Sequence, residues 1–221
     1  MILKHDSQYG ARLTADAGIA IGPILFVIAV LGILAAAIAA GSGSFTAGSA
    51  AENNRTKAAA MIEIGQNLKI GWERITGSAE VDFNDVLIDI NNTSAENALF
   101  SPLGGGITSP SVTMGNQPAS DAWHYPKGNF VGLGTGVRPN QWAVLKVAPG
   151  VCDEINAKTN GFTTTPAGND LGNFEDDDTV IPNDQVITNW PAALNGKPSG
   201  CVNNTNGTKN GTYFYQIIGI R

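Results

Sequence analysis

One run of carboxylates is the most distinctive chemical feature of the sequence. Glu175-Asp176-Asp177-Asp178 places four acidic side chains in a row, and Asp170 lies shortly before them. Adjacent carboxylates repel one another, and a hard cation with oxygen ligands, such as Ca²⁺, would relieve that repulsion. The residue order of an EF-hand loop is missing, so a solvated acidic loop is the alternative. The candidate calcium ligands are Asp170, Glu175, Asp176 and Asp178, and the sequence suggests no other cofactor.

Side chains suited to catalysis are scarce. The chain has two histidines, His5 and His124. Neither belongs to a serine-nucleophile elbow, a zinc-protease helix or a papain-like cysteine site. The glycine-rich segment 132–136 lacks the spacing of a dinucleotide-binding loop. We therefore predict a non-enzymatic protein with no catalytic and no cofactor-binding residue.

The two cysteines allow a single disulfide. Cys152 and Cys201 are too few for a four-thiolate zinc site. A bridge between them would close a loop of about 50 residues, and the loop-entropy estimate for such a closure is roughly 4 kcal/mol. We expect this bridge to tie the acidic region to the last strand. Two free thiols are the alternative if the domain lies in a reducing compartment.

The charge balance argues against nucleic-acid binding. The chain carries 13 basic and 19 acidic residues, a net charge of −6, whereas nucleic-acid-binding surfaces need clustered lysine and arginine. Only 14% of the residues are charged, against a typical share of about 25%. The sequence must therefore contain an apolar segment beyond a normal core.

That segment runs from Ala17 to Ala40 and contains 24 residues without a charge. A bilayer core about 30 Å thick is crossed by about 20 apolar residues in a helix. Lys4 and Arg12 precede the segment, which predicts a membrane helix with a cytoplasmic N-terminus. The alternative is a cleaved secretory signal that ends at Ala39.

A second helical segment follows the apolar one. Residues 50–75 place apolar side chains at spacings of mostly three and four, which predicts an amphipathic helix of about seven turns. Gly41-Ser42-Gly43-Ser44 has low helix propensity, so we expect the helix to melt at a weak point in 41–49. Beyond Gly77, short apolar runs alternate with Asn-Gly pairs, the pattern of a loop-rich β domain. The predicted strands are Val81–Ile90, Gln141–Val147, Gln185–Trp190 and Thr212–Ile220.

These elements predict an α+β fold. A long N-terminal α-helix, apolar and then amphipathic, is expected to pack on a small antiparallel β-sheet domain with one disulfide. The expected organisation has three parts. They are a leader or cytoplasmic segment at 1–18, the helix at 19–76, and a loop-rich β globular domain at 77–221.

This layout resembles that of the type IV pilins and pseudopilins, and in particular their type IVb branch. The resemblance is carried by the stretch IGPILFVIAVLGILAAAIAAG, by the amphipathic helix to Ile75 and by the cysteine pair near the C-terminus. It implies a subunit that is held in the inner membrane, cut by a prepilin peptidase and moved by an assembly machinery into a helical homo-oligomeric filament. The core of such a filament is a bundle of N-terminal helices. In this chain the core side chains would be Pro23, Leu25, Phe26, Ile28, Leu31, Leu34 and Ile38.

The resemblance also implies a processing site. Family members are cut after a glycine and carry glutamate at the fifth mature position. A cut after Gly18 makes Ile19 the first residue and places Pro23 fifth, whereas a cut after Gly10 makes Ala11 the first residue. We predict cleavage between Gly18 and Ile19, because the mature chain then begins with its apolar run; an unprocessed chain is the alternative. Because the glutamate is missing, three kinds of protein remain possible: a minor pilin subunit, a pseudopilin or a member of a separate filament lineage.

The predicted function is that of a structural subunit of a type IV pilus-like extracellular filament. The subunit would be held in the bacterial inner membrane before assembly, with its globular domain in the periplasm or outside the cell. One alternative is a membrane-anchored periplasmic or surface domain that binds glycans or proteins. Another is a secreted enzyme whose signal peptide ends at Ala39.

Overall fold

The computed structural model describes the chain over these ranges: 21–78, 81–92, 94–115, 122–129, 132–134, 140–168, 187, 189–205 and 210–221. Within the first helix, side chains are described at 25–37 and 48–78. The chain divides into two compact units, unit 1 (Met1–Gly48) and unit 2 (Ser49–Arg221).

The longest element is the helix α1 (Ile21–Ser78), which contains 58 residues. Its backbone stays helical throughout 41–49. The melted stretch expected at Gly41-Ser42-Gly43-Ser44 is therefore wrong. Glycine costs about 1 kcal/mol relative to alanine in a helix, but propensity is a weak determinant, and alanine-rich sequence on both sides favours the helix.

Within unit 2, α1 is amphipathic. Its buried hydrophobic residues follow one another at intervals of three, four or seven positions, so they lie on one side of the helix. This buried stripe belongs to the main core of unit 2. Its members are Ala58, Met61, Leu68, Trp72 and Ile75.

Unit 2 is built on a five-stranded sheet with the strand order β1-β2-β5-β4-β3. Neighbouring strands are antiparallel except β3 and β4, which are parallel. The strands are β1 (Lys127–Gly128), β2 (Asn140–Lys146), β3 (Ala167–Gly168), β4 (Ser199–Asn204) and β5 (Gly211–Gly219). The connections include the helix α2 (Pro149–Thr159) and 3₁₀ turns at Thr113–Gly115 and Ala192–Leu194.

The predicted fold class is wrong in two respects. The sheet is mixed and not antiparallel, because β3 runs parallel to β4. Among the described side chains of α1, those that belong to the main core all lie in unit 2, and those at 25–37 are all exposed. The physical reason is that the one-sided apolar stripe of a packed helix begins at Ala58, whereas 25–37 is apolar on every side.

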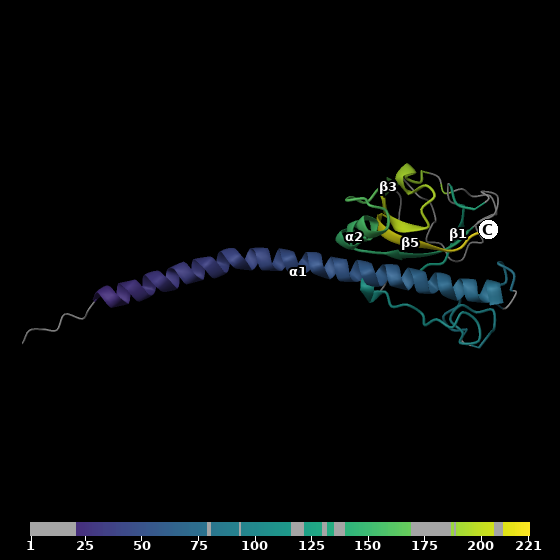
Figure 1. Ribbon diagram of the computed structural model, residues 1–221, viewed down its shortest axis with the longest axis horizontal. Coiled ribbons are helices and arrows are strands. Elements are labelled where there is room, and N and C mark those ends of the chain that lie inside the picture. Colours follow the sequence, from purple (N-terminus) through teal and green to yellow (C-terminus); the bar gives the residue numbers. More distant parts are fainter. Residues whose placement is uncertain are drawn as a thin grey trace, which may run out of the picture. The chain divides into compact units, whose positions relative to one another are not determined.

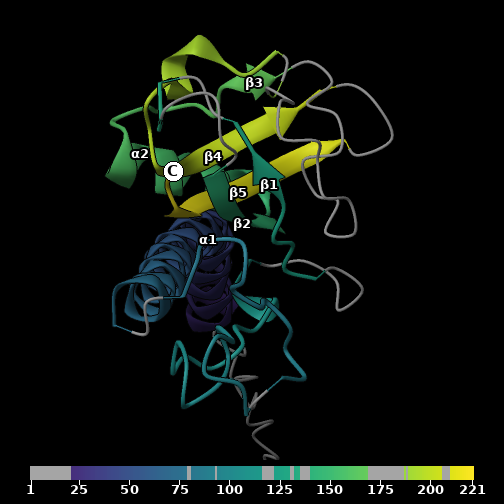
Figure 2. The same cartoon turned by 90° about the vertical axis from the view of Figure 1, so that its right-hand side faces the viewer.

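The strand β5 lies between β2 and β4 in the middle of the sheet (Figure 2). All of its residues after Gly211 are buried, so it is covered on both faces. Successive strand residues point to opposite faces. Phe214 therefore belongs to the core that contains α1 and α2, whereas Tyr213 and Tyr215 belong to a second apolar cluster with Trp142 and Trp190. The rings of Trp190 and Tyr215 meet edge to face with centroids 5.0 Å apart. The sheet thus separates two apolar clusters.

In unit 2, α1 lies between the sheet and the segment 81–115, drawn in teal (Figure 1). Two glycines permit close contact on the two sides. A Cβ at Gly65 would lie 2.9 Å from Cζ of Phe214 in β5, and a Cβ at Gly71 would lie 3.0 Å from Cδ1 of Ile107. A larger residue at either position would force its neighbour to move.

The predicted disulfide is confirmed. Cys152 of α2 is bonded to Cys201 of β4, their Cα atoms are 5.4 Å apart, and both are fully buried. Asn156 supports the bridge, because its Nδ2 donates to the Cys201 carbonyl at 2.9 Å and its Oδ1 accepts from the Cys201 N–H at 2.8 Å. The bridge ties α2 to β4, whereas a tie to the last strand was expected.

Two of the four predicted strands coincide with strands of the sheet. Gln141–Val147 matches β2 and Thr212–Ile220 matches β5 within one or two residues. Val81–Ile90 contains a turn in place of a strand, in which the Asp85 N–H donates to the Asp82 carbonyl at 2.9 Å. The residues of 185–190 that the structure describes also lie outside the strands.

Candidate functional site

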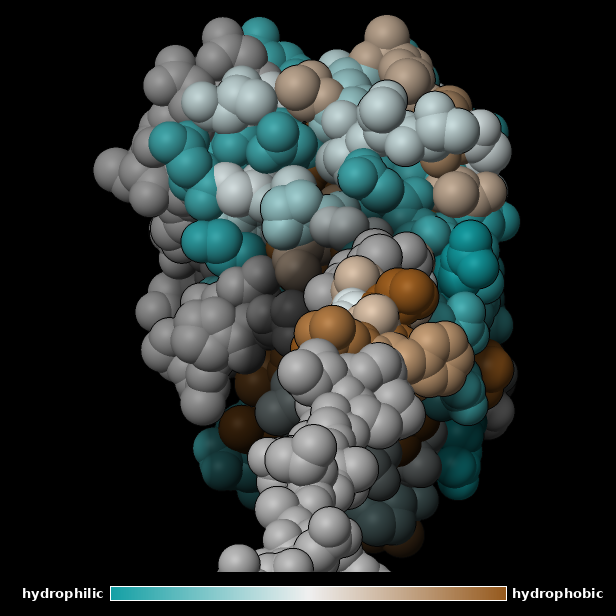
Figure 3. Space-filling view, turned by 90° about the vertical axis from the view of Figure 1, so that its left-hand side faces the viewer, coloured by the Kyte–Doolittle hydropathy of each residue, from teal (hydrophilic) through white to brown (hydrophobic). Residues whose placement is uncertain are grey.

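In unit 1, the described side chains of α1 form a surface without charge. The eight large hydrophobic residues at 25–37 are between 38% and 71% exposed. Figure 3 shows these side chains in brown and tan on the part of α1 that faces the viewer. We call residues 25–37 the apolar segment. Its large residues are Leu25, Phe26, Val27, Ile28, Val30, Leu31, Ile33 and Leu34.

The side chains of the apolar segment point in every direction around the helix. At 3.6 residues per turn, its 13 residues make more than three turns. An ordinary surface helix carries an apolar stripe on one side only. A single partner on one side would therefore leave the other apolar sides in water, and complete burial needs neighbours on several sides.

The structure places only some residues of the predicted filament core and processing site. Pro23 and Ile38 lie in the helical backbone of α1, but their side chains fall outside the description, and Gly18 and Ile19 fall outside it altogether. The other predicted core residues belong to the apolar segment and are exposed. They are Leu25, Phe26, Ile28, Leu31 and Leu34.

The predicted calcium ligands also fall outside the described residues, which stop at 168 and resume at 187. These ligands are Asp170, Glu175, Asp176 and Asp178. Among the residues that are described, no group of three or more His, Cys, Asp and Glu side chains could hold a metal ion.

The predicted inner-membrane location is contradicted. Over the described part of the chain, none of the helices combines enough length with enough apolar character to cross a membrane.

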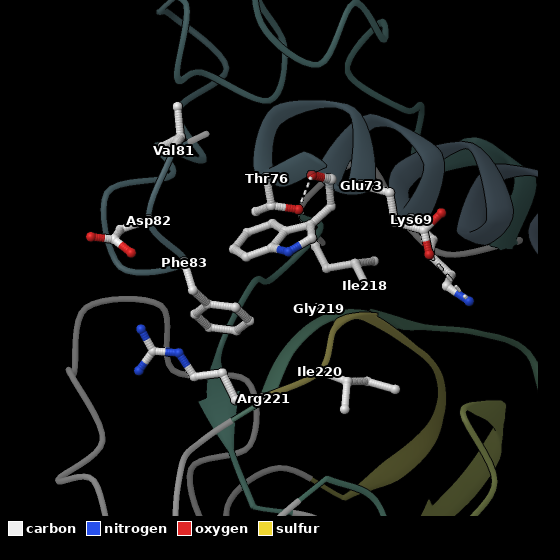
Figure 4. A pocket seen from close by; sticks show the side chains of 11 residues that line it. Lys69, Glu73, Thr76, Val81, Asp82, Phe83, Ile218, Gly219, Ile220 and Arg221 are labelled. Carbon is white, nitrogen blue, oxygen red and sulfur yellow. Dashed lines mark hydrogen bonds and ion pairs between the residues drawn. The ribbon is translucent and has the colours of Figure 1, made fainter. Parts of the chain in front are cut away.

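Unit 2 has a pocket of about 460 Å³ beside the C-terminal end of α1, which we call the end pocket (Figure 4). The rings of Trp72 and Phe83 meet edge to face there, with centroids 4.9 Å apart. The guanidinium of Arg221 lies 4.4 Å from the Phe83 ring centroid, within the range of a cation–π contact. Gly219 permits this arrangement, because a Cβ there would lie 2.8 Å from Phe83 Cε2.

The end pocket carries charges of both signs. Lys69 Nζ lies 3.6 Å from Glu73 Oε1, and Asp82 and Arg221 also line the pocket. Lys127 of β1 is not a lining residue of the pocket; burial lowers its pKa, and the positive charge of Arg221 lowers it further. Because aromatic rings and both signs of charge meet here, the end pocket suits a polar ligand better than an apolar one.

A second pocket of unit 2, which we call the side groove, has a volume of about 390 Å³ and lies between α1 and the segment 107–114. Its apolar side chains are Ile64 and Leu68 from α1 and Ile107 and Met114 from the facing segment. The remaining lining residues are Pro110 and four uncharged polar residues, which are Asn67, Thr108, Ser109 and Ser111. The side groove therefore differs from the end pocket in having no charged lining residue.

Sequence reasoning did not predict either pocket. Trp72 was expected only as part of the apolar stripe of a helix. Phe83 follows the end of α1 and Arg221 lies far from both residues in the sequence, and the three side chains meet only through the fold. No local motif signals such a combination, so these pockets could be found only in three dimensions.

No family model, curated protein or solved structure matches this chain. The resemblance to the type IV pilins stays a prediction from the sequence. A functional proposal must therefore begin with the exposed apolar segment and the two pockets.

Proposed function

We propose that this protein is a structural subunit of a helical filament of the type IV pilin kind, in which copies of the apolar segment cover one another. The observation that supports this proposal is the exposure of 25–37 on all sides of a helix without a charge. A bundle of identical helices provides apolar neighbours on several sides at once. A groove in a single partner covers one side only.

The free energy available from such a bundle is large. Full burial of a large apolar side chain contributes about 1.5–3 kcal/mol. Eight such side chains that are already about half covered would together contribute on the order of 10 kcal/mol per copy. This gain must exceed the cost of immobilising each copy, for which estimates start at about 4 kcal/mol.

The small residues of the apolar segment favour close helix packing. Apart from the adjoining residues and the helix's own backbone, Gly32 has no heavy atom within 4 Å of the position where a Cβ would lie. Ala29, Ala35, Ala36 and Ala37 are also exposed. Small side chains allow two helix backbones to approach closely, which increases their van der Waals contact.

A charge placed in the apolar segment tests the proposal. Ile33 is 71% exposed, so Ile33→Lys leaves the folding of unit 2 unchanged and places an ammonium in the proposed bundle. Ile90→Lys is the matched control, because Ile90 is 57% exposed and lies outside α1. Sedimentation and electron microscopy of the full chain measure assembly.

We expect the wild type and Ile90→Lys to form fibres, and Ile33→Lys to remain unassembled at concentrations at least tenfold higher. The proposal fails if the full-length wild type stays monomeric with 25–37 intact. It also fails if Ile33→Lys assembles as readily as the control.

The proposal includes maturation by a prepilin peptidase between Gly18 and Ile19, as the resemblance implies. Intact mass measurement of the protein recovered from its natural source tests this step. A mature N-terminus at Ile19 supports it, whereas an N-terminus at Ala40 would favour a secreted protein without the apolar segment.

The end pocket supports a second candidate function, recognition of a glycan or protein by unit 2. Its aromatic rings and mixed charges are typical of sites that bind polar ligands. Trp72 lies in the pocket wall and provides a fluorescence signal. A panel of oligosaccharides and peptides that leaves the tryptophan emission unchanged would remove this candidate.

A further inference from the structure

We propose that the side groove of one copy receives a large apolar side chain from the apolar segment of a second copy. This inference depends on the proposed filament function and assigns a specific contact within it. The proposed contact joins the side groove in unit 2 of one copy to residues 25–37 in unit 1 of another copy.

The side groove has the shape and the walls of an apolar binding site. Ile64 and Leu68 belong to consecutive turns of α1, and Ile107 packs against the same helix through Gly71. Met114 lies at the rim and is 45% exposed. A methionine adapts its flexible side chain to different apolar partners, which suits a surface that closes around an incoming residue.

The lining of the side groove selects an uncharged occupant. A charged ligand would lose its hydration there without meeting an opposite charge, which is costly. The end pocket differs, because four charged side chains line it. Thr108, Ser109 and Ser111 are exposed around the side groove and stay hydrated when an apolar side chain enters.

The apolar segment is an occupant of the required chemistry. Its 13 residues include no charge, and Phe26 and Ile33 are 70% and 71% exposed. Because its side chains point in all directions, it can place one side chain in a groove and still contact other helices. A partner helix that is apolar on one side only would use that side in the groove and would have no other apolar side for further helices.

The pairing is asymmetric, and this property links it to filament growth. The groove and the apolar segment are different surfaces, so each copy can receive one neighbour and insert into another. Such heterologous contacts produce rings or open filaments, whereas a surface that pairs with itself produces a closed dimer. The contact therefore extends an open filament wherever its rotation does not close a ring.

Photo-crosslinking between two isotopic forms of the full chain tests the contact. One form is unlabelled and carries benzoylphenylalanine at Met114, and the other is wild type and labelled with ¹⁵N. After co-assembly and irradiation, mass spectrometry identifies the labelled peptide that is attached. The control carries the photo-crosslinker at Ile90, which is exposed but does not line the groove.

We expect crosslinks from position 114 to labelled peptides that contain 25–37, and none of these from position 90. Met114→Lys, which places a charge at the groove rim, should raise the critical concentration for assembly about tenfold, the loss of roughly one apolar contact. Ile90→Lys should leave it unchanged.

Two results overturn the inference. The first is filaments in which position 114 crosslinks only to other regions. The second is unchanged assembly of Met114→Lys. Either result leaves the proposed filament function standing, because that function is tested by Ile33→Lys and by fibre formation of the wild type.

Discussion

Replacing Gly65 with alanine measures how tightly α1 packs against the sheet. The added Cβ would lie 2.9 Å from Phe214 Cζ, 3.0 Å from Gln216 Oε1 and 3.2 Å from Gln216 Cβ. Phe214 is 0% exposed and Gln216 is 1% exposed, so neither can move without disturbing the core. Overpacking of a core costs about 1–3 kcal/mol, whereas alanine gains about 1 kcal/mol over glycine in a helix. The steric cost is the larger of the two, so we expect Gly65→Ala to lower the free energy of unfolding by about 1 kcal/mol.

Gly77→Ala is the matched control, because Gly77 also lies in α1 and its added Cβ would meet no heavy atom within 4 Å beyond the adjoining residues and the helix's own backbone. We expect this variant to be as stable as the wild type or slightly more stable. All four tryptophans of the chain belong to unit 2, so their fluorescence during urea or thermal unfolding reports on that unit. For a unit of this size, 1 kcal/mol lowers the Tm by about 2–4 °C. Gly65→Ala with a stability equal to that of Gly77→Ala would refute the reasoning.

Three further predictions concern the disulfide, a buried tyrosine and the net charge. Replacing Cys152 and Cys201 with alanine should lower the free energy of unfolding by roughly 4 kcal/mol, and an unchanged urea midpoint would contradict this value. Burial raises the pKa of Tyr215, so the unfolded state loses the phenolic proton first. Stability should therefore fall above about pH 10, by up to about 1.4 kcal/mol per pH unit. Tyr215→Phe should reduce that slope in pH-dependent urea unfolding; equal slopes would show that another group is responsible. Salt should promote assembly by screening the net charge of −6, and light scattering that falls as NaCl is added would count against this.

The two strands that the sequence predicts well are those with continuous apolar and aromatic residues. β2 and β5 are neighbours in the sheet, and each is almost entirely buried. β4 was missed because its sequence, SGCVNN, has low β-propensity. Its position is set by six residue pairs with β5, a long-range feature that no local pattern contains.

The helix α2 was missed although its sequence carries local signals. Pro149 stands at the start of the helix, where its fixed φ and missing N–H are tolerated. Val151, Cys152 and Ile155 then form a short apolar face that is fully buried. These three residues are spaced one, three and four positions apart, as on one face of a helix, but they span too few residues for the period to identify a helix. One of them is also a cysteine, which was expected only to form part of a disulfide.

The candidate surfaces were predictable from the sequence to different degrees. The apolar segment follows from composition alone, because an uncharged run is visible in the sequence. Its exposure is a three-dimensional property, since it depends on whether the rest of the chain offers a surface that covers it. The pockets depend on the fold even more, because each joins residues of α1 to segments that follow it.

The main core of unit 2 is formed by side chains of unit 2 itself. The buried stripe of α1 and the helix α2 share one core with the sheet, and Trp142 and Trp190 belong to the cluster on the opposite face. Gly65 and Gly71 bring the sheet and the segment 81–115 close to two sides of α1. The apolar stripe of α1 is thus buried within unit 2, and the side groove is a pocket of unit 2 without a charged lining residue. In the proposed filament, additional copies of this chain would provide both an apolar side chain for the side groove and apolar neighbours for residues 25–37.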